Sequence, residues 1–336
     1  MIVSGYLLLR VYYPQETRTN PNLKPKTMKT NLIRLVFLFL AVTGLSLSGC
    51  KKDKNTGASD DSASMQQLSK DEEAVESASE ESMNDVNNLL AGGSLKSTER
   101  RVPCNAKIDS TAVVNDTITI YITYNGVNCM GNRFRSGKVE IKKQVGTHWF
   151  QQGATVMVRH IDFAITKMKN QKMITLNGVR FYQNVSGGLI WQIGPDLPTI
   201  VHRTWGYVNI SFEDGTTKTW NIARQNTFSG IFPDNLSLTS DGFGTVDGYE
   251  NLVAWGLNRH GENFYTQILQ PVTRCENCNW DPLSGITKHS IPAGSKSATL
   301  TFGYDENDQP VVNECPSKYK LDWQRNNKSG TIFLWL

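Results

Sequence analysis

Side chains that could transfer protons are spread singly along this chain of 336 residues. The five histidines occur one at a time, at His148, His160, His202, His260 and His289. Each is more consistent with a surface position or a hydrogen-bonded strand position than with a catalyst. Glycoside hydrolysis needs two carboxylates about 5–9 Å apart, and no pair is fixed by its spacing. GxSxG, HExxH, P-loop and dinucleotide-binding patterns are missing in a suitable context, so we predict no catalytic residue.

Two segments, 241–251 and 304–308, carry the oxygen donors that calcium prefers. Neither matches the spacing of an EF-hand, so we interpret both as turns. A zinc site built from Cys275, Cys278 and Cys315 would need a fourth ligand, for which His289 is the nearest histidine in sequence. We expect neither a metal nor a cofactor.

Five cysteines lie after residue 100, which is typical of an oxidising compartment. Cys104 and Cys129 flank the first alternating segment, and Cys278 and Cys315 flank the penultimate hairpin region, so we predict these two disulfides. Cys275 is then left over. A Cys275–Cys278 redox pair is the alternative, because CxxC spacing lowers a thiol pKa.

The segment Leu47-Ser48-Gly49-Cys50 predicts lipid attachment. It follows a basic segment, 28–34, and an apolar segment, 35–47, and it resembles the bacterial lipobox. That resemblance implies cleavage before Cys50, a diacylglycerol on the thiol and acylation (palmitate) of the new amino group. The apolar segment is too short to span a bilayer, which needs about 20 residues. We predict a signal peptide at 28–49 and interpret 1–27 as an upstream extension from a misassigned start.

The basic charge of the chain belongs to this leader. Residues 1–49 hold six of the 35 basic and one of the 31 acidic side chains, so removal leaves a net charge near −1. Nucleic-acid binding therefore loses its electrostatic support. Lys51-Lys52-Asp53-Lys54 partly resembles the charged signal that sends lipoproteins of Bacteroidetes-type bacteria to the cell surface. We expect an outer-membrane lipoprotein held in the bilayer through Cys50, with surface display and periplasmic orientation both open.

Residues 50–100 are rich in Ser, Asp, Glu, Asn and Lys and poor in aromatics. Such a composition does not bury enough surface to fold alone, and it predicts a partly helical or disordered tether. Ser69 and Glu72 have the spacing of a capping box. Apolar residues recur at loosely helical spacing, at Leu68, Val75, Val86, Leu89 and Leu90. The alternative is a helix that docks on the domain or on a partner.

From residue 101 to the end, short runs of β-branched and aromatic residues alternate with polar ones. Turn sequences such as Asn177-Gly178 separate them. No long amphipathic pattern follows residue 100, so crossover helices are missing. We predict an all-β domain over 101–336, an antiparallel β-sandwich or extended β-meander that could divide into two subdomains.

A family resemblance rests on three elements of this region. Residues 128–139 hold Cys129 before a glycine turn and Arg133-Phe134-Arg135-Ser136-Gly137, residues 266–272 follow, and Cys278-Asn279-Trp280 precedes Cys315. Together they resemble a family of uncharacterised Bacteroidetes lipoproteins over about residues 104–336. The resemblance implies an exported β domain and the same two disulfides, and it implies no reaction. The chain departs from the family at Cys275, at Val272 and in the turn 307–314.

The eight tryptophans all lie in the predicted β domain. Most should be core, because aromatic rings dominate burial. Three lie near predicted turns and are candidates for stacking on sugar rings, namely Trp149, Trp191 and Trp205. We predict a non-catalytic binding or structural module that contacts polysaccharide or an envelope protein. A polysaccharide-acting hydrolase or lyase is the alternative.

Overall fold

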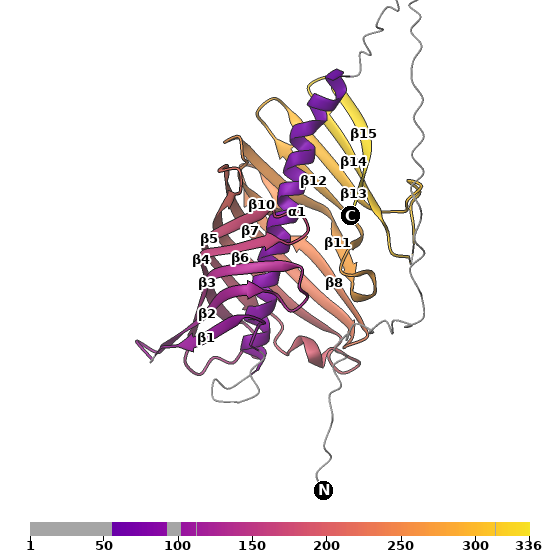
Figure 1. The fold of residues 1–336 in the computed structure, drawn as a ribbon. Helices are drawn as coiled ribbons and strands as arrows, with labels where there is room; N and C mark the ends of the chain where they lie inside the picture. The colour runs from indigo at the N-terminus through magenta and orange to yellow at the C-terminus, as the bar shows by residue number, and fades with distance from the viewer. Residues whose placement is uncertain (1–55, 93–101, 112, 313) are drawn as a thin grey trace, which may run out of the picture. The chain divides into compact units, whose positions relative to one another are not determined.

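The computed structural model describes residues 56–92, 102–111, 113–312 and 314–336 (Figure 1). Cys50, the predicted signal peptide and the upstream extension lie outside the described residues. The described residues form one compact unit of antiparallel strands and one long helix. The all-β prediction is therefore confirmed. Among the described residues, no helix is long and apolar enough to cross a bilayer.

The strands form a single antiparallel sheet in the order β1-β2-β3-β4-β5-β6-β7-β10-β11-β12-β13-β14-β15. Strand β8 pairs with β7 and β11, and β9 pairs with β10. Nearly every strand pairs with the next one along the chain, so the extended meander describes the fold and two stacked sheets do not. The bounds are β1 (Ala106–Ser110), β2 (Thr117–Val127), β3 (Arg133–Gln144), β4 (Ala154–Lys167), β5 (Met173–Asn184), β6 (Thr199–Phe212), β7 (Thr217–Ile231), β8 (Asn235–Gly242), β9 (Gly244–Val246), β10 (Tyr249–Leu257), β11 (Asn263–Cys275), β12 (Pro282–Ile291), β13 (Lys296–Tyr304), β14 (Lys318–Arg325) and β15 (Lys328–Trp335).

The two faces of the sheet differ because side chains alternate along each strand. In β6, Ile200, Val208 and Ile210 are fully buried, whereas Tyr207 is 49% exposed. The buried series lies on the face that packs against the helix. We call this the inner face, and the opposite one the outer face.

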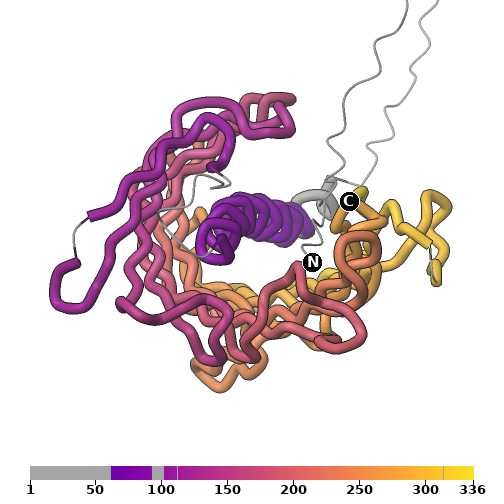
Figure 2. The backbone as a smooth tube through the Cα atoms, turned by 90° about the horizontal axis from the view of Figure 1, so that it is seen from below, coloured from indigo at the N-terminus to yellow at the C-terminus, as the bar shows by residue number. Residues whose placement is uncertain are grey.

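Helix α1 (Thr56–Ala91) lies against the inner face, and the sheet curves around it (Figure 2). Its apolar side chains belong to the same hydrophobic cluster as those of the strands: Met65, Leu68, Val75, Ala78, Met83, Val86 and Leu90. Full burial of one such large side chain contributes about 1.5–3 kcal/mol. The prediction of a tether was thus wrong for these residues, and the alternative, a docked helix, is what the structure has.

The helix crosses the strands in the reverse of their order in the sequence. Its hydrogen-bond partners move from Tyr319 in β14, which contacts Ser69, to Tyr124 in β2, which contacts Asp85. The capping box predicted from Ser69 and Glu72 is also wrong, because α1 begins thirteen residues earlier at Thr56. Both side chains lie within the helix and face the sheet.

Charges hold the helix as well as apolar contacts. Glu72 forms an ion pair with Lys218, whose side chain has no exposed surface. Further ion pairs join Asp71 to Arg259, Glu76 to Arg224 and Arg274, Glu80 to Arg224, Glu81 to Arg133, and Asp85 to Arg135. Burial opposes ionisation of Glu76, yet Arg224 and Arg274 lower the pKa of its carboxyl below the ordinary value. An acidic helix is therefore matched to a basic inner face.

Both predicted disulfides are confirmed, Cys104–Cys129 and Cys278–Cys315. The first closes the region between the start of the sheet and the β2–β3 turn. The second joins η2 (Glu276–Cys278) to the segment before β14. Cys275 has a free, half-buried thiol, so the Cys275–Cys278 redox pair is not formed.

The buried ion pair between Glu72 and Lys218 gives a stability prediction. Glu72→Gln leaves the Lys218 ammonium buried without a counter-charge, so we expect the free energy of unfolding to fall by about 3–5 kcal/mol. Glu250→Gln is the matched control, because Glu250 is exposed and forms no ion pair with the described residues. It should change stability by about 0.5 kcal/mol or less. Equal effects of the two changes in urea unfolding would contradict the importance of this contact.

Candidate functional site

Three of the five histidines lie in the helix–sheet junction, where they are closed off from solvent. His160 lies 2.8 Å from Ser82 Oγ and 3.1 Å from Arg180 Nη2 through its Nε2 atom. His202 Nδ1 lies 2.6 Å from the Tyr182 hydroxyl, and His289 Nδ1 lies 3.0 Å from Thr266 Oγ1. All three are 2% exposed or less, so they bond within the fold and do not reach a substrate.

Burial determines the protonation of these rings. Desolvation lowers the pKa of His202 to about 3, and desolvation with the charge of Lys218 lowers the pKa of His289 to about 3. Desolvation and Arg180 also place the pKa of His160 well below its ordinary value. The three rings are therefore neutral hydrogen-bonding partners. His148 and His260 are exposed, and His148 stacks on Phe150.

Of the two segments considered for calcium, 304–308 is a turn, as expected, whereas 241–251 is mostly strand, because it holds β9 and the adjoining ends of β8 and β10. Asp305 Oδ1 accepts hydrogen bonds from the backbone N–H groups of Asn307 and Gln309. Asp247 accepts one from the Tyr265 hydroxyl, and Asp241 accepts one from the N–H of Gly242. In the part of the chain that the structure describes, no three His, Cys, Asp or Glu side chains are grouped to hold a metal ion.

The three tryptophans proposed for sugar stacking do not converge. Trp149 is 4% exposed, its indole N–H donates to Asn87 Oδ1, and its ring packs on Tyr182, so it offers no face to a ligand. Trp191 is 54% exposed and lies in the short helix η1 (Ile190–Gln192) between β5 and β6. Trp205 is half-buried on the outer face of β6. Sequence reasoning placed Trp205 near a turn, whereas it lies in the middle of a strand.

Trp205 belongs to a row of aromatic side chains on the outer face. The strand register sets Trp205 opposite Phe181, and their rings stack with centroids 5.6 Å apart. Tyr207 follows two positions later on the same face, and its cross-strand partner Asn221 pairs in turn with Trp255. Phe243 lies beside Ala223 through a backbone hydrogen bond. We call Phe181, Trp205, Tyr207, Phe243 and Trp255 the aromatic strip.

The aromatic strip combines exposed rings with polar groups. Phe181, Tyr207 and Phe243 are 39%, 49% and 40% exposed. The Arg203 guanidinium lies 5.2 Å from the centre of the Phe243 ring and donates from Nε to Gln225 Oε1. Sequence reasoning missed Phe181, Tyr207 and Phe243, although cross-strand pairing of alternating segments could have grouped them.

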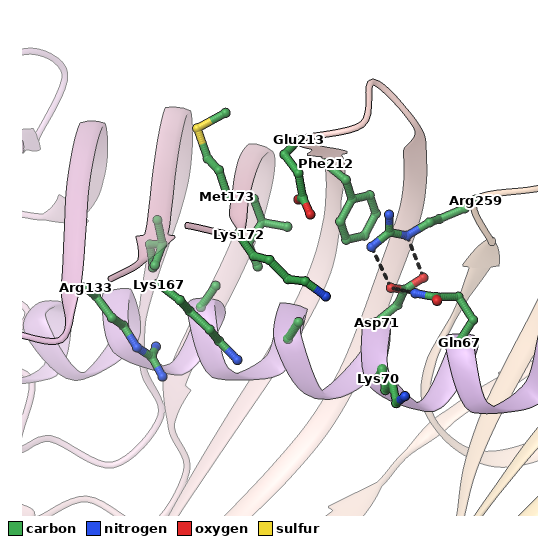
Figure 3. A pocket seen from close by; sticks show the side chains of 14 residues that line it. Gln67, Lys70, Asp71, Arg133, Lys167, Lys172, Met173, Phe212, Glu213 and Arg259 are labelled. Carbon is green, nitrogen blue, oxygen red and sulfur yellow. Dashed lines mark hydrogen bonds and ion pairs between the residues drawn. The ribbon is translucent and has the colours of Figure 1, made fainter. Parts of the chain in front are cut away.

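A second feature is a cavity of about 180 Å³ between α1 and the ends of the strands that it crosses (Figure 3). Its wall holds five cationic side chains, Lys70, Arg133, Lys167, Lys172 and Arg259. We call it the cationic pocket. Figure 3 shows Lys167 and Lys172 extending from the turn between β4 and β5 towards the helix, and Arg259 joined to Asp71. Sequence reasoning missed this pocket, because its residues come from six separate segments.

Comparison with known proteins finds no match to this chain. No protein-family model, no curated protein and no solved structure matches it. The resemblance to Bacteroidetes lipoproteins therefore stays a prediction, and the function rests on the geometry above.

The three buried histidines predict a pH dependence of stability. Their pKa values in the folded state lie below the ordinary 6.5, so the unfolded chain binds more protons as the pH falls below 6.5. The contribution of all three is present above pH 6.5 and falls below it, and for His202 and His289 it is lost towards pH 3. We expect each to cost about 1.4 kcal/mol per pH unit in that window.

Urea unfolding between pH 7 and pH 5 measures this slope. His289→Gln should reduce the slope by about one third, since it removes one of the three buried histidines that contribute to it. His148→Gln, at an exposed position, should leave the slope unchanged. A stability that is flat over this range would contradict the buried, neutral state of these rings.

Proposed function

We propose that this chain is an extracytoplasmic lipoprotein, anchored in the outer membrane through Cys50, that binds glycans on its aromatic strip without catalysis. The observation that carries the binding function is the row of partly exposed aromatic rings across adjacent strands of the outer face. The two disulfides support an oxidising compartment outside the cytoplasm.

The shape and chemistry of the aromatic strip suit sugar rings. A pyranose has flat faces made of C–H groups and an edge of hydroxyls, so it fits an aromatic ring with hydrogen-bonding groups nearby. Trp205 and Phe181 are tilted by only 18°, so their two rings are nearly parallel. Arg203 and Gln225, in register with each other beside them, supply a donor and an acceptor for hydroxyls.

The rigidity of the sheet favours binding over chemistry. The strip lies on the central strands β5, β6 and β10, which are paired on both sides, and on Phe243 between β8 and β9. Side chains there keep a fixed spacing, which matches a repeating polymer. Asp241 is the carboxylate in register with Gln225, and its Oδ1 accepts a hydrogen bond from a backbone N–H group. A binding module therefore agrees better with this face than a hydrolase or lyase, which needs two opposed carboxylates.

Binding to soluble polysaccharides tests this proposal. Affinity electrophoresis through gels containing xylan, laminarin, mannan or dextran should retard the protein in at least one of them. Trp205→Ala combined with Tyr207→Ala should weaken that binding by about tenfold, because each lost ring contact is worth about 0.5–1.5 kcal/mol. Trp335→Ala is the matched control, because Trp335 is 64% exposed but lies on the edge strand β15. Retardation that is lost equally in the control would contradict a role of the strip.

Lipid attachment has a separate test in cells. The full chain is expressed in a Gram-negative host and labelled with an alkyne analogue of palmitate. Cys50→Ala should abolish the label, whereas Cys275→Ala, which removes the free thiol of β11, should retain it. Label on the Cys50→Ala protein would refute the lipobox assignment. Protease treatment of intact cells then distinguishes surface display from a periplasmic orientation.

A further inference from the structure

We infer that the cationic pocket beside helix α1 binds a small organic anion, one ring in size, through a carboxylate, sulfate or phosphate group. This site is separate from the aromatic strip, because it lies where the helix meets the strand ends on the inner side of the sheet (Figure 3). The inference does not depend on the glycan proposal.

Beside this pocket, cations of the sheet lie next to the helix without a helix carboxylate to pair with. Lys218, Arg224 and Arg135 each face a helix carboxylate within ion-pair distance. Beside the pocket, α1 presents Lys70, Ala74 and Ala78, and its one lining carboxylate, Asp71, is already paired with Arg259. The helix thus adds a third ammonium group where Lys167 and Lys172 already point towards it.

The three lysines are available to a ligand. Arg133 and Arg259 are occupied by Glu81 and Asp71, at 2.8 Å in each case. Lys70, Lys167 and Lys172 form no side-chain hydrogen bond or ion pair with the described residues. Lys70 and Lys172 are exposed, and Lys167 is half-buried. An anion entering the pocket therefore meets ammonium groups that it need not detach from other partners.

Two carboxylates lie near the lysines without neutralising them. Glu213 lines the same cavity and has no ion pair with the described residues. Desolvation raises the pKa of the Glu73 carboxyl, although the nearby charges of Lys167 and Lys70 act to lower it. With Arg133 paired to Glu81 and Arg259 to Asp71, the three lysines exceed the remaining lining carboxylate, Glu213, by two charges. A single oxyanion of the ligand would reduce this excess.

The rest of the lining limits the size and character of the ligand. The walls include Ala74, Ala78, Ile165, Ile174 and the buried ring of Phe212. A cavity of about 150 Å³ lined by apolar side chains holds one benzene ring. The pocket, at about 180 Å³, is of that size with a charged rim. Its chemistry fits a ring that carries one anionic group, such as an aromatic carboxylate or a uronic acid.

Isothermal titration calorimetry on the full chain, which includes helix α1, tests this site with small soluble probes. Benzoate, glucuronate, glucose 6-sulfate and glucose 6-phosphate are compared with neutral glucose, each up to about 10 mM, the range of weak one-site binding. At least one anion should bind and glucose should bind at least about tenfold more weakly. The affinities of the carboxylate, sulfate and phosphate probes identify the preferred head group. No heat from any anion, or equal binding of glucose, would overturn the inference.

Matched lysine variants locate the binding. Lys167→Ala combined with Lys172→Ala should weaken the anion at least about tenfold, and Lys167→Arg should keep it within about threefold, because the charge remains. Lys169→Ala is the control, since Lys169 is exposed in the same turn but does not line the pocket. Lys172→Ala alone, at an exposed position, covers the case in which the double variant does not fold.

The outcomes separate this site from the aromatic strip. The Trp205→Ala, Tyr207→Ala protein should bind the anion as the unmodified protein does. Equal weakening by Lys169→Ala, or unchanged binding in the double lysine variant, would place the anion elsewhere and overturn the inference. Loss of glycan binding with anion binding intact would leave this inference standing by itself.

Discussion

The structure depends on complementarity between an acidic helix and a basic sheet face. Neither part is self-sufficient. The inner face of the sheet carries Lys218, Arg135 and Arg224, which are nearly or fully buried, and burying these charges without counter-charges would cost free energy. The helix is polar on average, so an isolated segment of this composition has little reason to stay helical in water. Docking gives the buried cations of the sheet their counter-charges, and it gives the helix an apolar surface to pack against.

This arrangement explains why the junction is charged where most protein cores are apolar. A buried ion pair gains little net free energy over a well-packed apolar pair, because both ions lose their hydration. What it adds is a strong cost for any misaligned position of the helix. A rotation of the helix about its axis would turn these carboxylates away from the buried cations of the sheet. The pairs Glu72–Lys218 and Asp85–Arg135 are separated by more than three turns of helix, so together they set its register.

Arg180 shows how closely the junction is packed. It has no exposed surface and no carboxylate within ion-pair distance among the described residues. Its guanidinium bonds to Ser79 Oγ and His160 Nε2, and desolvation lowers its pKa to about 10. The neutral imidazole of His160 serves here as an acceptor for a buried cation. The histidines are therefore part of the same electrostatic arrangement as the helix, and not remnants of a catalytic site.

The strands and the helix differ in how far sequence could predict them. Alternation in β2, β4 and β6 is local, so the meander and the disulfides that staple it follow from the residues themselves. The docking of the helix was only the alternative prediction, because its sheet-facing stripe interleaves Leu68, Val75 and Val86 with serines and carboxylates. The cations that pair with these carboxylates, such as Lys218 and Arg224, lie about 150 residues away in the sequence. No local pattern reveals that pairing. The same distance hid the cationic pocket, whereas Trp205 was found because its residue type alone suggested a function.

The docked helix also decides where a ligand can bind. A curved sheet of this size would ordinarily offer its concave side as a binding groove. Here α1 fills that side with apolar and ionic contacts along its length, so a ligand would have to displace a helix whose polar partners are buried. Access is left to the outer face, where the aromatic strip lies, and to the flank of the helix beside Ala74 and Ala78, where the cationic pocket lies. Both proposed sites are thus places that the helix leaves open. Their chemistry differs because strand register alone positions the aromatic rings of the outer face, whereas the charged residues of the helix and its neighbours line the pocket.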